Sequence, residues 1–334
     1  LNYAEGNEMR KRTLGKSGFK VSEIGLGCWQ LGGDFGPVEE ERAREILCAA
    51  ESGQINFWDT ADVYGAGESE RRIGRHVQAS GTQPILATKV GRDAALYPDK
   101  YTKSAVRESI EGSAQRLGVD TIDLVQLHCI PPEILYAGNI IGWLEDFRSD
   151  GLIRAYGASV ETLEEAKFAA TLPGLTSIQL IFNIFRQNAI QELFPIAEAN
   201  DVGIIVRLPL ASGVLAGKMS ADQQFAPGDH RQYNRSGEAF SQGETFSGVP
   251  FELAVELTER MRPWAPEGQT MAQMAMRWIL DQPAVSTVIT GASSPVQVRE
   301  NASVSDLEPL PAELHERLAR FYAAEIEPHI VVPI

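Results

Sequence analysis

Eight apolar segments of strand length alternate with segments of helical periodicity along almost the whole chain, and this alternation restricts the possible folds more than any other feature. In the helical segments, apolar residues recur at spacings of three and four, and glycine or asparagine follows the last turn. A pattern typical of a β-hairpin opens the series, in "RTLGKSGFKVSEIGLG". The predicted strands span residues 23–27, 55–59, 84–89, 121–128, 153–159, 177–182, 203–210 and 285–290.

This alternation predicts an α/β fold, a (β/α)8 TIM barrel with an N-terminal β-hairpin and a long loop after strand seven. The reason is that right-handed βαβ crossovers, repeated eight times, close a parallel sheet into a barrel. An open doubly wound sheet is the alternative. It would need fewer strands or a G-x-G-x-x-G fingerprint after the first strand, and "GLGCWQLGG" does not have that spacing. We expect residues 9–334 to form one domain, preceded at 1–8 by a flexible leader or expression-derived residues.

The long loop comprises residues 217–250, which have no clear period and are rich in Gly, Ser, Asp and Gln. A loop of this length in a compact domain is usually a binding or lid element, or is partly disordered. Because it follows the seventh predicted strand, we expect it to lie over the C-terminal face of the barrel.

Composition excludes several classes of partner. The chain has 45 acidic and 30 basic residues and a net charge of -15, which repels nucleic acid and anionic membrane surfaces. It contains neither an apolar run of membrane-spanning length nor a signal-peptide pattern, so the expected location is the cytoplasm. The three cysteines, Cys28, Cys48 and Cys129, fit neither a disulfide framework nor a zinc site and are interpreted as reduced thiols. We predict no metal.

Four strong polar groups follow three consecutive predicted strands. Asp59 ends the second strand with Tyr64 five residues later, Lys89 ends the third, and His128 ends the fourth. Taken singly, each residue has a structural interpretation. Asp59 would cap the next helix, Tyr64 would pack on the surface, Lys89 would be solvated, and His128 would fill a polar gap. Taken together, they place an acid, a tyrosine, a lysine and a histidine at one mouth of the barrel, where barrel enzymes build their active sites.

This combination suits proton transfer. A tyrosine holds its proton to a pKa of about 10, so a nearby cation such as Lys89 is needed to stabilise its phenolate. Asp59 would keep that lysine charged and in place, and His128 would hydrogen-bond the oxygen that is being protonated. The set has no activated nucleophile and no metal ligands, which favours a carbonyl that receives hydride from another source.

The same residues carry a resemblance to the aldo-keto reductases, over nearly all of residues 9–323. Its motifs are "GLGCW", "DTADVYGAGESE", "ATKVG", "DLVQLH", "GASV", "SIQLIFNIF", "LASGVLAGK" and "GASSPVQVREN". The resemblance implies a catalytic tetrad of Asp59, Tyr64, Lys89 and His128. It also implies a nicotinamide cofactor bound in extended form without a Rossmann domain. The family tendency favours NADP, with NAD or dual use as the alternative.

The resemblance also implies cofactor contacts. Ser159 and Gln179 would hold the carboxamide of the nicotinamide, and Lys218 would face the pyrophosphate. The full implied set is Cys28, Trp29, Asp59, Ser159, Gln179, Arg207, Leu210, Ser212, Gly213, Leu215, Lys218, Gly291, Ser293, Gln297, Glu300 and Asn301.

Three departures from the family pattern affect the cofactor. Many members place an aromatic residue where this chain has Arg207, whose charge would disfavour the oxidised cofactor; Arg207→Tyr should therefore change the relative affinity for the two forms. Val160 and Glu161 replace the asparagine and aromatic residue that often follow the serine. NADP-selective members commonly carry Lys or Arg where this chain has Ala292, Ser293, Ser294 and Gln297; Arg231, Arg235 or Arg299 would have to compensate.

We expect an oxidoreductase that transfers hydride to the carbonyl of an aldehyde, ketone or sugar, with Tyr64 as proton donor. One alternative is a cofactor-sensing regulatory subunit with little turnover, and another is a Schiff-base aldolase that uses Lys89. An aromatic wall around the substrate would come from Trp29, Tyr97, Tyr136 and Trp143. The sequence leaves the substrate, the direction of the reaction and the oligomeric state open.

Overall fold

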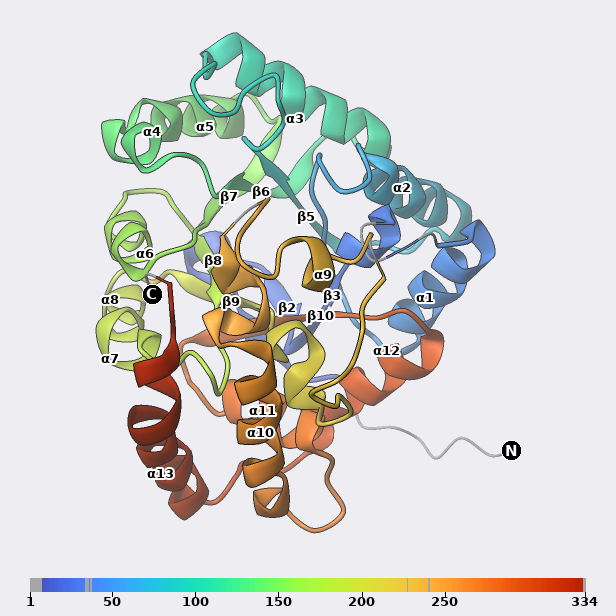
Figure 1. The fold of residues 1–334 in the computed structure, drawn as a ribbon. Helices are drawn as coiled ribbons and strands as arrows, with labels where there is room; N and C mark the ends of the chain where they lie inside the picture. The colour runs from blue at the N-terminus through green and yellow to red at the C-terminus, as the bar shows by residue number, and fades with distance from the viewer. Residues whose placement is uncertain (1–7, 34–35, 37, 227, 240, 333–334) are drawn as a thin grey trace.

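The computed structural model describes residues 8–33, 36, 38–226, 228–239 and 241–332. Eight parallel strands form a closed barrel in the order β10-β3-β4-β5-β6-β7-β8-β9. The strands are β3 (Ile24–Gly27), β4 (Phe57–Asp59), β5 (Ile85–Val90), β6 (Ile122–His128), β7 (Ile153–Ser159), β8 (Ser177–Ile181), β9 (Gly203–Arg207) and β10 (Val285–Gly291). Figure 1 shows the barrel surrounded by helices. The predicted TIM barrel is confirmed.

The N-terminal hairpin is also confirmed. It pairs β1 (Lys11–Thr13) with β2 (Lys20–Ser22) in antiparallel register. Its residues Leu14 and Val21 are fully buried and pack against the side chains inside the barrel. The hairpin therefore closes the N-terminal end of the barrel. The predicted leader at 1–8 lies outside the described residues except for Glu8.

Helices connect the strands and cover the outside of the barrel, and their apolar faces join one large buried cluster with the outward-facing strand residues. None of the described helices is long and apolar enough to cross a membrane. The helices are α1 (Glu40–Ser52), α2 (Glu68–Ser80), α3 (Lys103–Leu117), α4 (Pro132–Ala137), α5 (Asn139–Ser149), α6 (Leu163–Ala170), α7 (Ala189–Glu192), α8 (Phe194–Ala199), α9 (His230–Tyr233), α10 (Phe251–Met261), α11 (Met271–Leu280), α12 (Pro295–Ala302) and α13 (Ala312–Phe321).

The side chains inside the barrel are apolar near the hairpin and polar near the C-terminal ends of the strands. Near the hairpin, the strands contribute an apolar layer made of Phe57, Ala87, Leu124, Ala155, Ile205 and Ile289. Side chains two residues apart on a strand point to the same face. The residues two places further along β4, β5, β6 and β9 are Asp59, Lys89, Gln126 and Arg207, all buried. The period of two therefore puts polar groups inside the barrel at its C-terminal end.

Two observed strand boundaries differ from the prediction by two residues or more. The seventh barrel strand, β9, ends at Arg207 rather than at residue 210, because Leu208 has a positive φ of 52° and Pro209 has no N–H for the ladder. The second, β4, begins at Phe57 rather than at 55. The described residues between 217 and 250 form only the short helix α9 and two 3-10 turns. In Figure 1 this gold to orange segment crosses in front of the strands, as the predicted long loop should.

Candidate active site

A buried ion pair forms the base of the site. Lys89 Nζ donates to Asp59 Oδ1 at 2.5 Å and to the carbonyl oxygen of Thr60 at 2.8 Å, and the two charged side chains are 1% and 2% exposed. Burial alone would lower the pKa of Lys89, but the charge of Asp59 and the oxygen of Tyr64 outweigh it and raise the pKa above its usual value. The lysine is therefore a fixed cation.

Tyr64 lies in the turn after β4, within reach of this cation. Lys89 Nζ lies 3.3 Å from the tyrosine oxygen and 4.9 Å from its ring centroid. The turn needs glycine at Gly65, where φ is +57° and an added Cβ would lie 2.1 Å from the carbonyl oxygen of Gly32. Burial raises the pKa of Tyr64 to about 12, although Lys89 acts in the opposite direction. Tyr64 is thus a protonated group that can donate.

His128 faces Tyr64 from the end of β6, with ring centroids 5.9 Å apart and ring planes at 87°. Burial, together with the charges of Lys89, Arg92 and Arg207, lowers the pKa of His128 well below its usual value, so the imidazole is neutral near pH 7. Its Nδ1 is buried and has no hydrogen-bond partner among the described residues. A buried polar atom in this state is unusual and is suited to a ligand.

Two glutamines hold the other oxygen of Asp59. Gln126 Nε2 donates to Asp59 Oδ2 at 2.9 Å, and Gln179 Nε2 donates to the same oxygen at 2.8 Å. Sequence reasoning missed Gln126. The signal was present, because Gln126 lies two residues before His128 on one strand and therefore points to the same side. Gln179 was expected to contact the cofactor; its Oε1 accepts from Ser159 Oγ at 3.5 Å.

Asp59, Tyr64, His128 and Gln179 line a cavity of about 470 Å³ at the C-terminal mouth, which extends to the start of α12. Of the residues implied as cofactor contacts, fifteen of sixteen line it: Cys28, Trp29, Asp59, Ser159, Gln179, Arg207, Leu210, Ser212, Gly213, Lys218, Gly291, Ser293, Gln297, Glu300 and Asn301. Leu215 does not, because its side chain is fully buried in the apolar cluster under this turn. Lys89 lies beneath the cavity floor rather than in its lining.

The turn after β9 and the long loop form one wall of the cavity. Ala211, Ser212 and Gly213 all have positive φ, of 46°, 56° and 95°, which is uncommon for successive residues. The hydroxyl of Ser212 donates to the carbonyl oxygen of Glu244 at 2.9 Å and accepts from the backbone N–H of Phe246 at 3.2 Å. Residues of the predicted long loop therefore bound the site.

Arg207 lies in a buried network of charges at the same wall. It approaches Glu244 to 3.4 Å and donates to the carbonyl oxygen of Val160 at 3.1 Å, whereas its buried Nε has no hydrogen-bond partner among the described residues. Arg92 pairs with Glu161 at 2.8 Å and with Glu244 at 3.5 Å. Arg207 therefore lines the cavity and keeps one buried N–H without a partner among the described residues.

Although we predict no metal, the described residues contain one group of potential ligand atoms. Atoms of Cys129, Glu161 and Glu244 lie within 4.8 Å of one another. Both carboxylates are already ion-paired with Arg92, and Glu244 also with Arg207. These arginines supply the positive charge that a cation would bring, so we infer no metal site from this group.

Comparison with known proteins identifies the family. A sequence model described as the aldo/keto reductase family matches residues 23–323. The chain belongs to that family. The uncharacterized oxidoreductase YqkF of Bacillus subtilis (strain 168) is 32% identical over 312 residues, covering 91% of this chain and 94% of that protein. The NADH-specific methylglyoxal reductase of Escherichia coli (strain K12) is 28% identical over 319 residues, covering 90% of this chain and 94% of that protein.

A solved structure agrees with this assignment. The holo form of the aldo-keto reductase AKR11C1 from Bacillus halodurans has a TM-score of 0.75 and 28% identity to this chain, over 94% of this chain and 96% of that one. This aldo-keto reductase is therefore an oxidoreductase, as the motifs of its sequence indicated.

The far end of the reductase's cavity lies at α12. Ser294 caps this helix by accepting from the backbone N–H of Gln297 at 3.3 Å. Gln297 Oε1 in turn accepts from both the backbone N–H and the hydroxyl of Ser293, at 2.7 and 3.0 Å. Three arginines had been considered as phosphate ligands here. Arg231 lines the cavity but is paired with Asp229, while Arg235 and Arg299 are not part of its lining.

Only one of the four predicted wall aromatics lies in the reductase's cavity. Trp29 stacks on Tyr64 with centroids 5.8 Å apart and contacts the cavity. The prediction was wrong for the other three, because they lie on outer helices and loops. Tyr97 and Tyr136 are exposed, and Trp143 in α5 packs on the outer apolar cluster. His230 of the long loop also lines the cavity, with its ring 5.2 Å from that of Trp29.

Asp62 lies in the turn before α2, a helix that begins after Gly67 without a side-chain cap. The Asp62 side chain is buried, with Oδ2 accepting from Ser109 Oγ on α3 at 3.2 Å and Oδ1 unpartnered among the described residues. Burial, reinforced by the charge of Glu70, raises its pKa to about 7.

Proposed function

We propose that this aldo-keto reductase transfers hydride between a nicotinamide cofactor and the carbonyl of a small aldehyde, ketone or sugar, with Tyr64 as the proton donor. The observation that carries the proposal is the contact of a protonated tyrosine with a buried, ion-paired lysine beside a neutral histidine. A carbonyl oxygen at this mouth meets two hydrogen-bonding groups and one fixed cation. This arrangement supports protonation of the oxygen.

The cavity residues fit a nicotinamide dinucleotide, which supplies the hydride when it is bound. Arg207 Nε and His128 Nδ1 are buried polar atoms without partners among the described residues, and both residues line the cavity. Ser159 and Gln179 would hold the carboxamide. The turn from Leu210 to Gly213 and the exposed Lys218 would face the pyrophosphate, and the start of α12 would face the adenosine end.

In the proton step, Tyr64 donates its hydroxyl proton to the substrate oxygen as the carbonyl is reduced. Lys89 stabilises the phenolate that remains, because its charge lies 3.3 Å from that oxygen. Asp59 keeps the lysine in position, and the two glutamines keep Asp59 in position. His128 orients the substrate oxygen as a neutral hydrogen-bond partner. Solvent later returns the proton to Tyr64.

Whether NADP or NAD is bound depends on the residues at the start of α12. The family tendency favours NADP, yet Gln297 already accepts both the N–H and the hydroxyl of Ser293, which a 2′-phosphate would need. Arg231, a candidate phosphate ligand, is already ion-paired with Asp229. We therefore propose that NADP and NAD are both accepted. Steady-state rates with each, in both directions, measure the ratio.

The decisive experiment compares the natural protein with Tyr64→Phe and with Tyr136→Phe, an exposed tyrosine that serves as the control. Short aldehydes, ketones, 2-oxoaldehydes such as methylglyoxal, and sugars are assayed with NADPH, NADH and their oxidised forms. Loss of the proton donor should lower kcat by about 10²- to 10⁴-fold, with cofactor affinity retained. Full activity of Tyr64→Phe would refute its role. Cofactor binding without turnover on any substrate would favour the regulatory alternative.

A further inference from the structure

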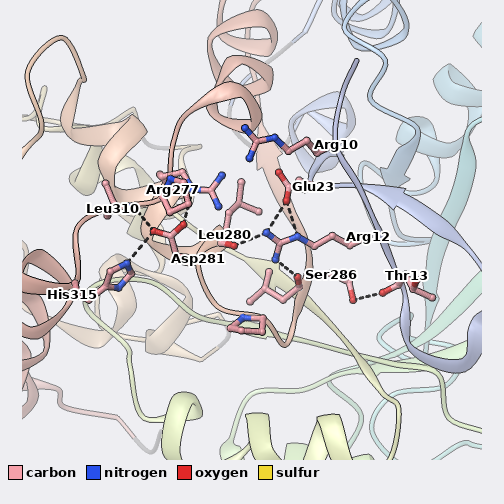
Figure 2. A pocket seen from close by; sticks show the side chains of 14 residues that line it. Arg10, Arg12, Thr13, Glu23, Arg277, Leu280, Asp281, Ser286, Leu310 and His315 are labelled. Atoms are coloured by element: carbon pink, nitrogen blue, oxygen red, sulfur yellow. Dashed lines mark hydrogen bonds and ion pairs between the residues drawn. The ribbon is translucent and has the colours of Figure 1, made fainter. Parts of the chain in front are cut away.

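A second cavity, of about 730 Å³, opens at the opposite end of the barrel. It lies between the N-terminal hairpin, the C-terminal end of α11, the first residues of β10 and the start of α13, as Figure 2 shows. Its lining includes Arg10, Arg12, Arg277 and His315. None of these residues belongs to the active site described above, and the proposed function gives them no role.

The charges of this cavity do not cancel. Its lining has three arginines against two carboxylates, Glu23 and Asp281, which leaves an excess of one positive charge before His315 is considered. The whole chain, in contrast, carries a net charge of -15. A local excess of arginine in an acidic protein is a feature that attracts anions.

Both carboxylates already have hydrogen-bonding or ion-pair partners within the protein. Glu23 pairs with Arg12 at 2.7 Å and accepts from Ser305 Oγ at 3.1 Å. Asp281 accepts from Arg277 Nε at 2.8 Å, from the backbone N–H of Leu310 at 2.9 Å and contacts His315 Nε2 at 3.0 Å. Arg12 is committed too, because its other nitrogens donate to three backbone carbonyl oxygens of residues 280, 282 and 285. Arg12 is therefore a structural residue.

Two guanidinium groups retain free donors. Arg277 is 3% exposed, and it uses Nε for Asp281 and Nη1 for a long contact of 3.4 Å with the carbonyl oxygen of Leu307. Its Nη2 has no partner among the described residues. The Arg10 side chain is exposed and likewise has no partner among them. In Figure 2 no dashed line reaches the Arg10 guanidinium. It is unusual for a nearly buried arginine to have an N–H donor without a partner among the described residues, and such a donor suits an anionic ligand.

We propose that this cavity is a binding site for a small molecule carrying a phosphate group, held between Arg10 and Arg277. Guanidinium groups present paired N–H donors that match phosphate oxygens, and two of them suit a dianion better than a carboxylate. The cavity is larger than inorganic phosphate, so a phosphate ester fits as well as the free anion. The hairpin and α11 position the arginines, and the main cavity at the other end of the barrel is not involved.

Isothermal titration calorimetry tests the site with inorganic phosphate and with glycerol phosphate, against sodium chloride at equal ionic strength. We expect saturable binding of at least one of the two, weakened about ten-fold or more by Arg10→Gln, since a hydrogen bond to a charged group is lost. Arg277→Lys, which keeps the charge but not the fork, should weaken it similarly. Arg42→Gln on the exposed surface of α1 is the matched control and should bind normally.

Binding to the cofactor site must be separated from binding here. Lys218→Gln alters the active-site cavity alone, so phosphate binding that survives in Lys218→Gln and fails in Arg10→Gln supports the second site. The opposite pattern, or titration curves that match those of chloride, overturns it. Tighter binding of glycerol phosphate than of phosphate identifies an ester as the ligand, and the reverse order identifies the free anion.

Discussion

Replacing Asp62 by asparagine should remove a pH-dependent weakness from the fold. The carboxyl group is buried against α3, bonded through one oxygen to Ser109, and exposed to the repulsion of Glu70. Burial raises its pKa from 3.8 to about 7. A carboxyl whose pKa is raised by folding destabilises the folded state once it ionises. The protein therefore loses stability as the pH rises from about 4 to about 7, and the loss is complete above that range.

The size of the change in stability follows from the change in the pKa of Asp62 on folding. A difference of about 3 pKa units, at about 1.4 kcal/mol per unit, corresponds to about 4 kcal/mol of unfolding free energy. This is an upper value, because water penetration and relaxation reduce the effective penalty of a buried charge. Asparagine keeps the acceptor for Ser109 and cannot ionise. Its amide hydrogens add a cost that does not depend on pH.

Urea unfolding followed by tryptophan fluorescence measures the effect. The difference in unfolding free energy between Asp62→Asn and the natural protein should increase in favour of the variant by a few kcal/mol between pH 4.5 and pH 8, of order the value above. Asp120→Asn, at an exposed carboxyl, is the control and should show no comparable change. A constant difference between Asp62→Asn and the natural protein across this range would show that Asp62 is not an ionising buried acid.

Three further outcomes concern the active site. Lys89→Met should abolish turnover and destabilise the fold by about 3–5 kcal/mol, because Asp59 is left as an unpaired buried charge; adding Asp59→Asn should restore stability in urea titrations but not activity. Gln126→Leu removes one of the two amides on Asp59 and should lower kcat about ten-fold or more in steady-state assays, with exposed Gln191→Leu as the unaffected control. In the proposed mechanism, alcohol oxidation needs Tyr64 deprotonated, and burial raises the pKa of Tyr64 to about 12. The oxidation rate should therefore still be rising at pH 9, whereas the reduction rate should not rise with pH.

The meeting of Asp59, Tyr64, Lys89 and His128 at one mouth of the barrel could be predicted from sequence, because two regular periods determine where these residues lie. The strand–helix alternation places every strand end at one mouth of the barrel, and the alternation of side chains within each strand points Asp59, Lys89 and His128 inward together. Gln126 obeys the same rule and could have been found two residues before His128. The eight strands could be predicted because each lies in an apolar segment bounded by turn residues.

The other features of the structure depend on contacts between residues that are far apart in the sequence. Such contacts leave no periodic pattern from which they could be predicted. Leu215 was implied as a cofactor contact, but its side chain is fully buried in the apolar cluster. Trp143 and Tyr136 belong to helices whose distance from the barrel mouth cannot be read from spacing. The second cavity joins residues 10 and 277, which are far apart in sequence. Such pairings arise only when the hairpin closes the N-terminal end of the barrel.

The protonation states of the site have one consequence for its chemistry. Lys89 and Asp59 form a neutral pair, Tyr64 keeps its proton, and His128 is uncharged, so the tetrad as a whole carries no net charge. Burying a lysine at 1% exposure costs stability unless its partner is fixed, and the two glutamines on Asp59 fix it. In the proposed proton transfer, the loss of the Tyr64 proton gives these four residues a net negative charge, and Lys89 is already in contact with the phenolate oxygen. The buried ion pair therefore stabilises the phenolate without rearrangement, which favours an acid over a nucleophilic role for this site.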